Sequence, residues 1–230
     1  MPHAVPPHVR ASRVFRQVPP DAVARMLDEA SPRALRTHEV LARQGDEGRS
    51  FYLVVDGYLK LVQLTAEGRE IVVRFVGPGE PFGGVVALED VRYPVTALAT
   101  GPVRVLSWTR EALRRHIDAT PAIKTNLMQE MADHMNDALT RVRELATERV
   151  EQRVARTLLR LARPHGRADD LALLVPHPVT QQELAEMAGT TLYTVNRILS
   201  RWKAEGVLRA APRGRIAIVS RHRLEEAAFE

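Results

Sequence analysis

The spacing of hydrophobic and polar positions changes twice along the chain. Residues 13–34 are predicted to form short helices, because the apolar residues of the stretch DAVARMLDEA have helical spacing. In residues 37–107, short runs such as FYLVVDG, YLKLVQL and EIVVRFV alternate with glycine-containing turn signals. Asp56-Gly57 between two apolar runs is the signature of a tight hairpin turn. Many short strands at a spacing of about ten residues predict an antiparallel β-sandwich or β-roll.

A long helical segment follows the strand-rich region. Pro121 suits the first turn of a helix, and neither Gly nor Pro follows until after Ala162. Within residues 121–147 the apolar positions step by 3, 4, 3, 4 and 3, which is the spacing of a heptad seam. The predicted seam consists of Met128, Met131, Met135, Ala138, Val142 and Leu145. This stripe packs either on the chain's own roll or on a second copy of the helix. Its length favours a homodimer, because one small roll cannot cover it.

Two short helices separated by a glycine are predicted near the end of the chain. Thr180 is an N-cap candidate with a Glu three residues on, the spacing of a capping box. Gly189 marks the end of the first helix, and Thr190 or Thr191 can cap the second. Two short helices joined in this way form a helix-turn-helix. The Pro/Gly-rich stretch 163–170 is interpreted as a loop within the same domain.

The second of these helices has one apolar and one polar face. Its buried stripe is expected to be Val195, Ile198, Leu199 and Trp202. The opposite face carries Thr191, Tyr193, Thr194, Asn196, Arg197 and Arg201. The sequence that follows, LRAAPRGRIAIVS, predicts two strands around a Pro-Arg-Gly turn, which would form a wing.

Charge then indicates what the polar helix binds. The chain has 230 residues, 45% apolar and 27% charged, which is ordinary for a globular protein of one or two domains. Its net charge is +5, but between Arg197 and Arg223 Glu205 is the one anion among eight cations. The cations are Arg197, Arg201, Lys203, Arg209, Arg213, Arg215, Arg221 and Arg223. This nearly single-signed run favours a polyanion-binding face over a merely solvated surface.

The sequence excludes several classes of protein. No apolar run approaches the about eighteen residues of a membrane helix, and no signal peptide is predicted, so a cytoplasmic location is expected. Cysteine is absent, which excludes disulfides, thiolate zinc sites and iron–sulfur clusters. A cupin metalloenzyme needs histidines inside its roll, and residues 39–115 contain none. Because phosphate-loop, nucleophile-elbow and zinc motifs are also missing, neither an enzyme nor a metal site is predicted.

These features together predict a recognition helix in the DNA major groove. Arg197 is placed to donate two hydrogen bonds to guanine O6 and N7, worth about 1–3 kcal/mol of discrimination. Asn196 is a candidate to pair with adenine, and Tyr193 to touch a thymine methyl group or a phosphate. The start of the first helix and the wing are assigned to the phosphate backbone. The predicted DNA-binding residues are Thr180, Gln181, Gln182, Thr191, Leu192, Tyr193, Thr194, Asn196, Arg197, Arg201, Arg213 and Arg215.

From about residue 15 onward the chain resembles the Crp/Fnr family of bacterial transcription regulators. The resemblance is carried by GDEGRSFYLVVDGYLKLV, GPGEPFGG and VTQQELAEMAGTTLYTVNRIL. It implies an α+β fold with an N-terminal antiparallel β-roll of the cyclic-nucleotide-binding type, a long dimerisation helix and a C-terminal winged helix-turn-helix. The expected boundaries are a flexible arm at 1–14, the sensor at 15–120, the dimerisation helix at 121–147 and the DNA-binding domain at 148–230. The resemblance also implies a homodimer that binds an inverted-repeat operator in double-stranded DNA and contacts RNA polymerase.

The effector pocket implied by the resemblance departs from that of the cyclic-AMP-binding members. Their phosphate-binding Glu falls on Gly84, their Arg-Ser pair falls on Tyr93-Pro94, and Arg92 lies one residue early. Their adenine-reading Thr-Ser pair aligns with Ala138-Leu139. Cyclic AMP is therefore not expected to bind. An effector other than cyclic AMP is predicted at the roll–helix junction, near Gly83, Gly84, Arg92, Tyr93, His134 and Ala138.

Other sensing modes of the family leave one alternative open. The oxygen-sensing members use a cysteine cluster, which this chain lacks. A carbon-monoxide-sensing group ligates haem with an N-terminal proline and a histidine of the roll; Pro2 is present, but the roll position falls near Val85. The recognition helix is more similar to those of the nitric-oxide-responsive members. Haem-dependent sensing of either gas, with His134 as the histidine within reach, is thus an alternative, although a lone helix histidine is more often structural. A small organic effector, or none, is also open.

The recognition helix departs from the cyclic-AMP type as well. Leu192-Tyr193 stands where that type carries Arg-Glu, whereas Arg197 is retained. The operator is expected to share one guanine contact and to differ where Glu would read cytosine. A rival of another class is a cyclic-nucleotide-binding regulatory module without DNA function, and the predicted winged helix-turn-helix argues against it.

Overall fold

The structure is a computed structural model that describes residues 5–66, 68, 70–89, 91–162 and 173–229. The predicted loop at 163–170 lies outside the described residues. The chain divides into two compact units, residues 1–137 and 138–230, and the division falls within the long helix α5 (Ala122–Thr147).

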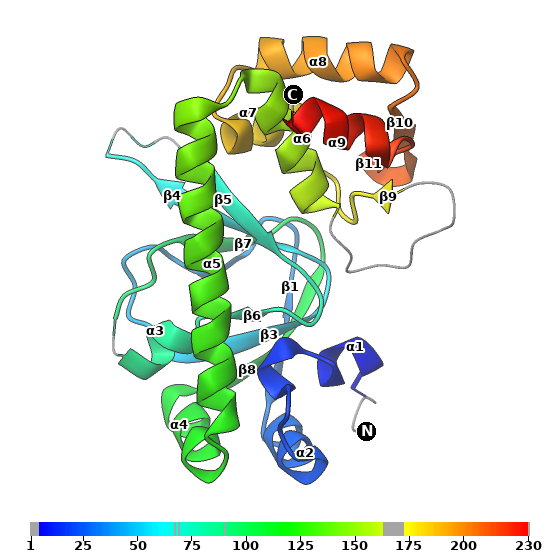
Figure 1. Cartoon of the computed structure of the whole chain (residues 1–230). Helices are drawn as coiled ribbons and strands as arrows, with labels where there is room; N and C mark the ends of the chain where they lie inside the picture. The colour runs from blue at the N-terminus through cyan, green and yellow to red at the C-terminus, as the bar shows by residue number, and fades with distance from the viewer. Residues whose placement is uncertain (1–4, 67, 69, 90, 163–172, 230) are drawn as a thin grey trace. The chain divides into compact units, whose positions relative to one another are not determined.

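Two four-stranded sheets form the β-roll of the first unit (Figure 1). Their strand orders are β1-β8-β3-β6 and β2-β7-β4-β5, and the paired strands run antiparallel. The strands are β1 (Ser31–Leu35), β2 (Val40–Ala42), β3 (Ser50–Asp56), β4 (Leu59–Leu64), β5 (Glu70–Val76), β6 (Pro81–Phe82), β7 (Thr96–Ala99) and β8 (Val103–Thr109). A short helix, α3 (Gly84–Glu89), follows β6. The predicted antiparallel β-roll is confirmed.

The turn at Asp56-Gly57 is not the hairpin that the sequence predicted. Strand β3 pairs with β8 and β6, whereas β4 pairs with β5 and β7, so the turn carries the chain from one sheet to the other. Gly57 has φ +78°, and a side chain there would collide with the carbonyl oxygen of Pro102. The Asp-Gly pair therefore marks a sheet-to-sheet corner, where the same positive φ is needed as in a hairpin turn.

The predicted flexible arm at 1–14 is wrong for its second half. Residues Pro7–Arg10 form helix α1 and Arg13–Phe15 a 3₁₀ turn, and Val9 and Val14 are completely buried in the core. His8 Nε2 hydrogen-bonds to the carbonyl oxygen of Val55 at 2.8 Å. Burial of the two valines offsets the conformational entropy lost when the segment is ordered. The prolines of the segment had suggested a flexible arm instead.

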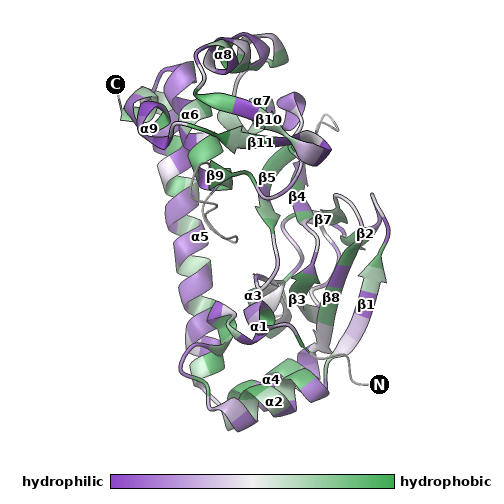
Figure 2. Ribbon diagram, turned by 90° about the vertical axis from the view of Figure 1, so that its right-hand side faces the viewer, coloured by the Kyte–Doolittle hydropathy of each residue, from purple (hydrophilic) through white to green (hydrophobic). Residues whose placement is uncertain are grey.

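Helices pack at one end of the roll around a common core. Helices α2 (Pro20–Asp28) and α4 (Arg110–Ala119) lie side by side in both views (Figures 1 and 2). Trp108 at the end of β8 is buried against them and donates its Nε1–H to the Met26 carbonyl at 2.7 Å. The first part of α5 joins this core through Ile123 and Leu127, which anchors the helix on the roll.

The second unit contains a winged helix-turn-helix. After α5, helix α6 (Val150–Leu161) is followed by α7 (Gln181–Ala188), α8 (Leu192–Ala204) and α9 (Arg221–Phe229). A three-stranded sheet of order β10-β11-β9 is formed by β10 (Leu208–Ala211), β11 (Arg215–Ile218) and β9 (Leu173–Leu174). The turn Pro212–Gly214 joins β10 to β11, as predicted for the wing. The α+β fold class is thus confirmed.

Candidate nucleic-acid interface and sensor site

The turn between α7 and α8 is fixed by its caps. The hydroxyl of Thr180 accepts the backbone N–H of Glu183 at 3.1 Å, and the Glu183 carboxylate accepts the backbone N–H of Thr180 at 2.9 Å. The predicted capping box is therefore confirmed. Helix α7 ends at Gly189, which has φ +61°, and the side chain of Leu145 lies where a Cβ would project. A larger residue at 189 would meet both backbone strain and a collision.

Arg153 on α6 holds the same turn from the side. Its Nε donates to the Ala188 carbonyl at 2.8 Å, its Nη2 to the Gly189 carbonyl at 3.1 Å and its Nη1 to the Glu148 carbonyl at 2.7 Å. A cation at this position satisfies carbonyl groups that the end of α7 leaves unpaired. Sequence reasoning missed Arg153, because its partners lie up to 36 residues away and follow no local spacing.

Helix α8 presents the polar face that was predicted to contact DNA, referred to below as the reading face. Val195, Ile198, Leu199 and Trp202 are all buried, as predicted. On the other face Tyr193 is 78% exposed. Arg197 is exposed too, and within the described part of the chain its guanidinium has no hydrogen bond or ion pair. Its donors are therefore available to a nucleic acid, as the guanine-reading assignment requires.

Threonines fix the start of α8. Thr191 is the N-cap: its hydroxyl accepts the backbone N–H of Thr194 at 3.2 Å, and the two hydroxyl oxygens lie 3.0 Å apart. Leu192, which follows the cap, is 46% exposed although it is apolar. Leu192 and Tyr193 thus form a small exposed apolar surface at the start of α8, which could contact the methyl group of a thymine.

Arg201 differs from the other predicted contacts on α8. Its guanidinium forms a short ion pair with Glu151 of α6 and lies 3.8 Å from the Glu205 carboxylate. The hydrogen bond to Glu151 raises the pKa of Arg201 above its ordinary value. Arg201 therefore links α8 to α6, and these donors are not free for DNA.

At the start of α7, two side chains predicted to contact phosphates already have hydrogen-bond partners within the protein. Gln181 accepts a hydrogen bond from the Nδ2 group of Asn196 at 3.0 Å, and Gln182 donates to Glu186 at 2.9 Å. The first backbone N–H groups of a helix have no intrahelical acceptor, so they remain suited to a phosphate. The side chain of Gln181 is instead engaged with the recognition helix.

The wing carries three arginines. Arg213 sits at the tip with φ +61°, and the Nε group of Arg215 donates to the Pro212 carbonyl at 3.1 Å. Arg209 on β10 is exposed and was not among the predicted contacts. All three side chains add positive charge beside α8, which favours phosphate contacts.

In the roll, the residues predicted to line an effector pocket are engaged in packing. Tyr93 is buried, its ring stacks on Phe82 with centroids 5.5 Å apart, and its hydroxyl donates to the Ser50 carbonyl at 2.8 Å. Burial raises the pKa of this phenol. A Cβ at Gly83 would lie 2.8 Å from the same Ser50 oxygen, and one at Gly84 would lie 2.8 Å from Leu127.

Two further residues of the predicted pocket are placed differently. Arg92 is exposed and donates to the Gly45 carbonyl at 2.6 Å. Ala138, in the second unit, is exposed. The structure thus gives Arg92 a backbone partner in the connection between β2 and β3, 47 residues away, so this donor is not free for an anion.

His134 belongs to a charged cluster of the first unit. Its Nε2 is in short contact with an Nη1 donor of Arg74, and Arg74 also pairs with Glu80 at 3.2 Å. Arg13 pairs with the buried Glu130 at 3.0 Å. Burial and then the charge of Arg74 lower the pKa of His134 to about 4. The imidazole is therefore neutral at ordinary pH, with Nε2 accepting from Arg74, and that nitrogen is not available to a haem iron.

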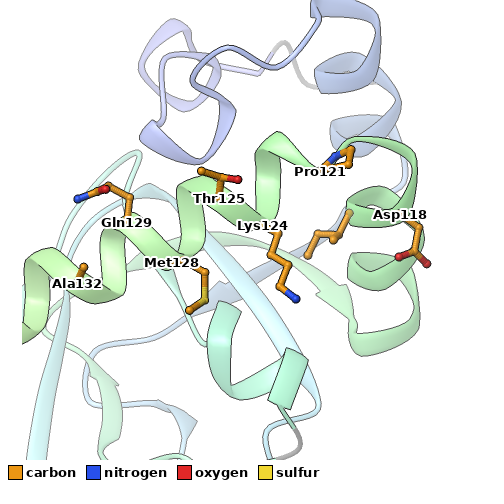
Figure 3. A pocket seen from close by; sticks show the side chains of 8 residues that line it. Asp118, Pro121, Lys124, Thr125, Met128, Gln129 and Ala132 are labelled. Carbon is orange, nitrogen blue, oxygen red and sulfur yellow. The ribbon is translucent and has the colours of Figure 1, made fainter.

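The predicted seam of α5 is exposed. Met128, Met131, Met135, Val142 and Leu145 are each 40–65% exposed, and Leu139, which the prediction omitted, is 62% exposed. Figure 2 shows hydrophobic residues recurring along α5 among hydrophilic ones. A groove of about 750 Å³ lies at the start of the helix (Figure 3). It is lined by Ile117, Asp118, Pro121, Lys124, Thr125, Met128, Gln129 and Ala132. An apolar stripe of this length is unusual for a surface that stays in water.

Neither a metal centre nor a membrane-spanning helix is found among the described residues. Among the described residues, no group of three or more His, Cys, Asp or Glu side chains is arranged to hold a metal ion. No helix in that part of the chain is long and apolar enough to cross a membrane.

The fold and the reading face define a DNA-binding protein that joins a cyclic-nucleotide-binding-type roll to a winged helix-turn-helix. Residues 32–120 match the family model of the cyclic nucleotide-binding domain, and residues 152–227 match that of the Crp-like helix-turn-helix domain. The chain belongs to the Crp/Fnr family of transcription regulators.

Individual relatives agree with this assignment. The chain is 30% identical to a CRP-like cAMP-activated global transcriptional regulator of Mycobacterium tuberculosis, over 85% of this chain and 88% of that protein. It is also 30% identical to a cyclic AMP receptor protein of Thermus thermophilus, over 96% and 99%. The structure of FixK2 from Bradyrhizobium japonicum has the same fold, with a TM-score of 0.76 at 24% identity over 87% of this chain and 98% of that one. The protein is therefore a DNA-binding transcription regulator and not an enzyme.

Proposed function

We propose that this regulator acts as a homodimer on an inverted-repeat operator, with α8 of each copy in the major groove. The single observation that carries the proposal is the face of α8, where Arg197 and Tyr193 are exposed while the apolar stripe behind them is buried. Arg197 donates to a guanine, and Leu192 and Tyr193 contact a thymine methyl group or the backbone. The wing arginines and the start of α7 bind phosphates.

The homodimer is supported by the exposed seam of α5. A parallel pair of these helices would bury the methionines, Leu139, Val142 and Leu145 against their copies. The groove at the start of α5 includes Met128 and so continues the seam (Figure 3). The division of the dimer into sensor (15–120), dimerisation helix (121–147) and DNA-binding domain (148–230), and its contact with RNA polymerase, are parts of the same proposal.

We further propose that any effector of the roll is not cyclic AMP. At the positions where the cyclic-AMP-binding pattern places its Arg-Ser pair, Tyr93 is buried in an aromatic stack. The cyclic-AMP-binding pattern places its Glu at Gly84, where a side chain would collide with Leu127. A cyclic phosphate at this place would therefore lack the charged partners that a buried anion requires.

Selection of binding sites from a random double-stranded DNA library tests the proposal. The expected product is an inverted repeat whose half-sites lie one helical turn apart, about 34–36 Å centre to centre. Cyclic AMP should change neither the affinity nor the selected sequence. A selected site without two-fold symmetry would contradict the homodimer, and binding that tightens strongly on adding cyclic AMP would contradict the effector proposal.

A further inference from the structure

The side-chain amide of Asn196 is held on both sides by its neighbours. Its Nδ2 group donates to Oε1 of Gln181 at 3.0 Å, and its Oδ1 accepts from the hydroxyl of Ser200 at 3.4 Å. Gln181 is the first residue of α7, and Ser200 lies one turn after Asn196 on α8. The three side chains form a bridge across the helix-turn-helix, on the face where Asn196 and Ser200 are exposed.

This bridge leaves Asn196 with one unused donor and one unused acceptor. A carboxamide has two N–H donors and two lone pairs on its oxygen. Gln181 takes one N–H and Ser200 takes one lone pair, so one N–H and one lone pair of the Asn196 amide remain for a ligand. Adenine presents the complementary pair in the major groove, with an acceptor at N7 and a donor at N6.

We infer that Gln181 and Ser200 are positioning residues that orient Asn196 to read an adenine in each half-site. This inference rests on the proposed function, because it requires α8 to lie in the major groove. Held in this way, the Asn196 side chain loses less rotamer freedom when DNA binds. The Asn196 side chain is therefore positioned by α7 and by its own helix before contact with DNA.

The neighbouring contacts make Gln181 a stable anchor. The capping box of Thr180 and Glu183 fixes the backbone where Gln181 begins α7. With its Oε1 engaged by Asn196, Gln181 still has its own Nε2 donors, which can reach a phosphate. A phosphate contact alone would affect every DNA sequence equally, whereas positioning of Asn196 affects only adenine recognition.

The test uses the full-length protein and the operator obtained by selection. Affinity is measured for this operator, for copies with each half-site adenine replaced by 7-deazaadenine, and for random DNA. For the wild type, 7-deazaadenine at the adenine read by Asn196 should lower affinity on the order of 5- to 100-fold, because N7 is lost. Asn196→Ala should lower operator affinity similarly and become insensitive to the modified base.

Gln181→Ala should reduce the effect of 7-deazaadenine at that adenine about threefold or more, and Ser200→Ala should reduce it less. Gln181→Glu keeps an acceptor oxygen for Asn196, so it should restore sensitivity to the modified base even if its charge weakens binding overall. The double variant Gln181→Ala/Asn196→Ala should discriminate no worse than Asn196→Ala alone. These readouts compare sequences, so a general loss of helix stability would not reproduce them.

Two outcomes would overturn the inference. One is Gln181→Ala weakening operator and random DNA equally while full sensitivity to 7-deazaadenine remains, which would make Gln181 a phosphate contact only. The other is a wild-type protein that is insensitive to 7-deazaadenine at every position. Failure of the proposed function itself is separate, since it would appear as an absence of any selected operator.

Discussion

Arg201 on the recognition helix α8 is ion-paired with Glu151 on α6, so a cation expected at the DNA serves to hold that helix in place. Glu205 and Arg223 extend the pairing, with Arg223 Nη1 donating to the Glu205 carbonyl at 2.9 Å. Ion pairs near the end of α8 thus connect helices α6, α8 and α9. The positive run after Arg197 is thus partly structural.

Arg201→Ala should lower stability more than it lowers sequence discrimination. About half of the side chain is exposed, so the loss in unfolding free energy should be about 1 kcal/mol or less. Thermal unfolding and competitive DNA binding measure the two effects. Glu151→Gln removes the same pair from the other side and should destabilise by a similar amount. If Arg201→Ala instead removed discrimination and left unfolding unchanged, the residue would be a base contact as first predicted.

Arg153→Ala should destabilise the helix-turn-helix by about 1–3 kcal/mol, because it leaves the carbonyl groups of Ala188, Gly189 and Glu148 without their charged donor. Denaturant unfolding of the full chain gives the change. Arg149→Ala is a suitable control, since Arg149 is exposed at the start of α6. Equal, small effects of the two substitutions would show that Arg153 does not hold the turn.

Met135→Glu should convert the dimer to a monomer, because it places two like charges opposite each other in a parallel seam. Sedimentation velocity distinguishes one chain of 25.7 kDa from a pair. Asn136→Glu adds the same charge at the adjacent exposed position outside the seam and should leave the dimer intact. A Met135→Glu protein that sediments as the wild-type dimer would contradict the assigned seam.

Acidification should destabilise the first unit through His134. In the unfolded chain the pKa of a histidine is about 6.5, whereas burial and the charge of Arg74 lower the pKa of His134 to about 4 in the folded protein. Between these values the unfolded state binds the extra proton, so stability falls as the pH falls from about 6.5 to about 4. The charged groups that face His134 are Arg74, Glu80, Glu130, Asp133 and Asp137.

The matched variant for this prediction is His134→Gln, which retains an acceptor for Arg74 but does not titrate. Thermal unfolding of both proteins at pH 7 and pH 5 gives the comparison. The wild type should lose more stability over this interval than the variant, while the carboxylates titrate alike in both. Equal losses would show that His134 is not kept neutral by its surroundings.

Local patterns in the sequence predicted most of the second unit. The capping box at Thr180, the glycine at 189 and the apolar stripe of α8 each depend on residues within one or two helical turns. The wing followed from alternating apolar residues around Pro212–Gly214. These elements could be predicted because their signals lie within them.

Features that depend on distant partners could not be predicted in this way. The sequence did not show that Val9 enters the core or that β1 begins at Ser31, since both depend on packing against β3 and β8. The same limit explains Arg201, whose partner Glu151 is 50 residues away. A charged residue on a polar helix face gives the same local pattern whether it binds DNA or another helix.

Whether α8 reads DNA through Arg197 is measured by the sequence preference of Arg197→Ala. The affinities of the variant and the wild type are compared on the selected operator and on operators in which each half-site guanine is replaced in turn. Lys203→Ala serves as the control, because Lys203 is an exposed cation of the same helix beyond the proposed reading residues and should contribute only uniform, salt-dependent affinity.

Arg197→Ala should lose the preference for one guanine per half-site, a change of about 1–3 kcal/mol, while its affinity for random DNA changes little. Wild-type preference at every guanine in the Arg197→Ala protein would show that α8 does not read DNA through Arg197.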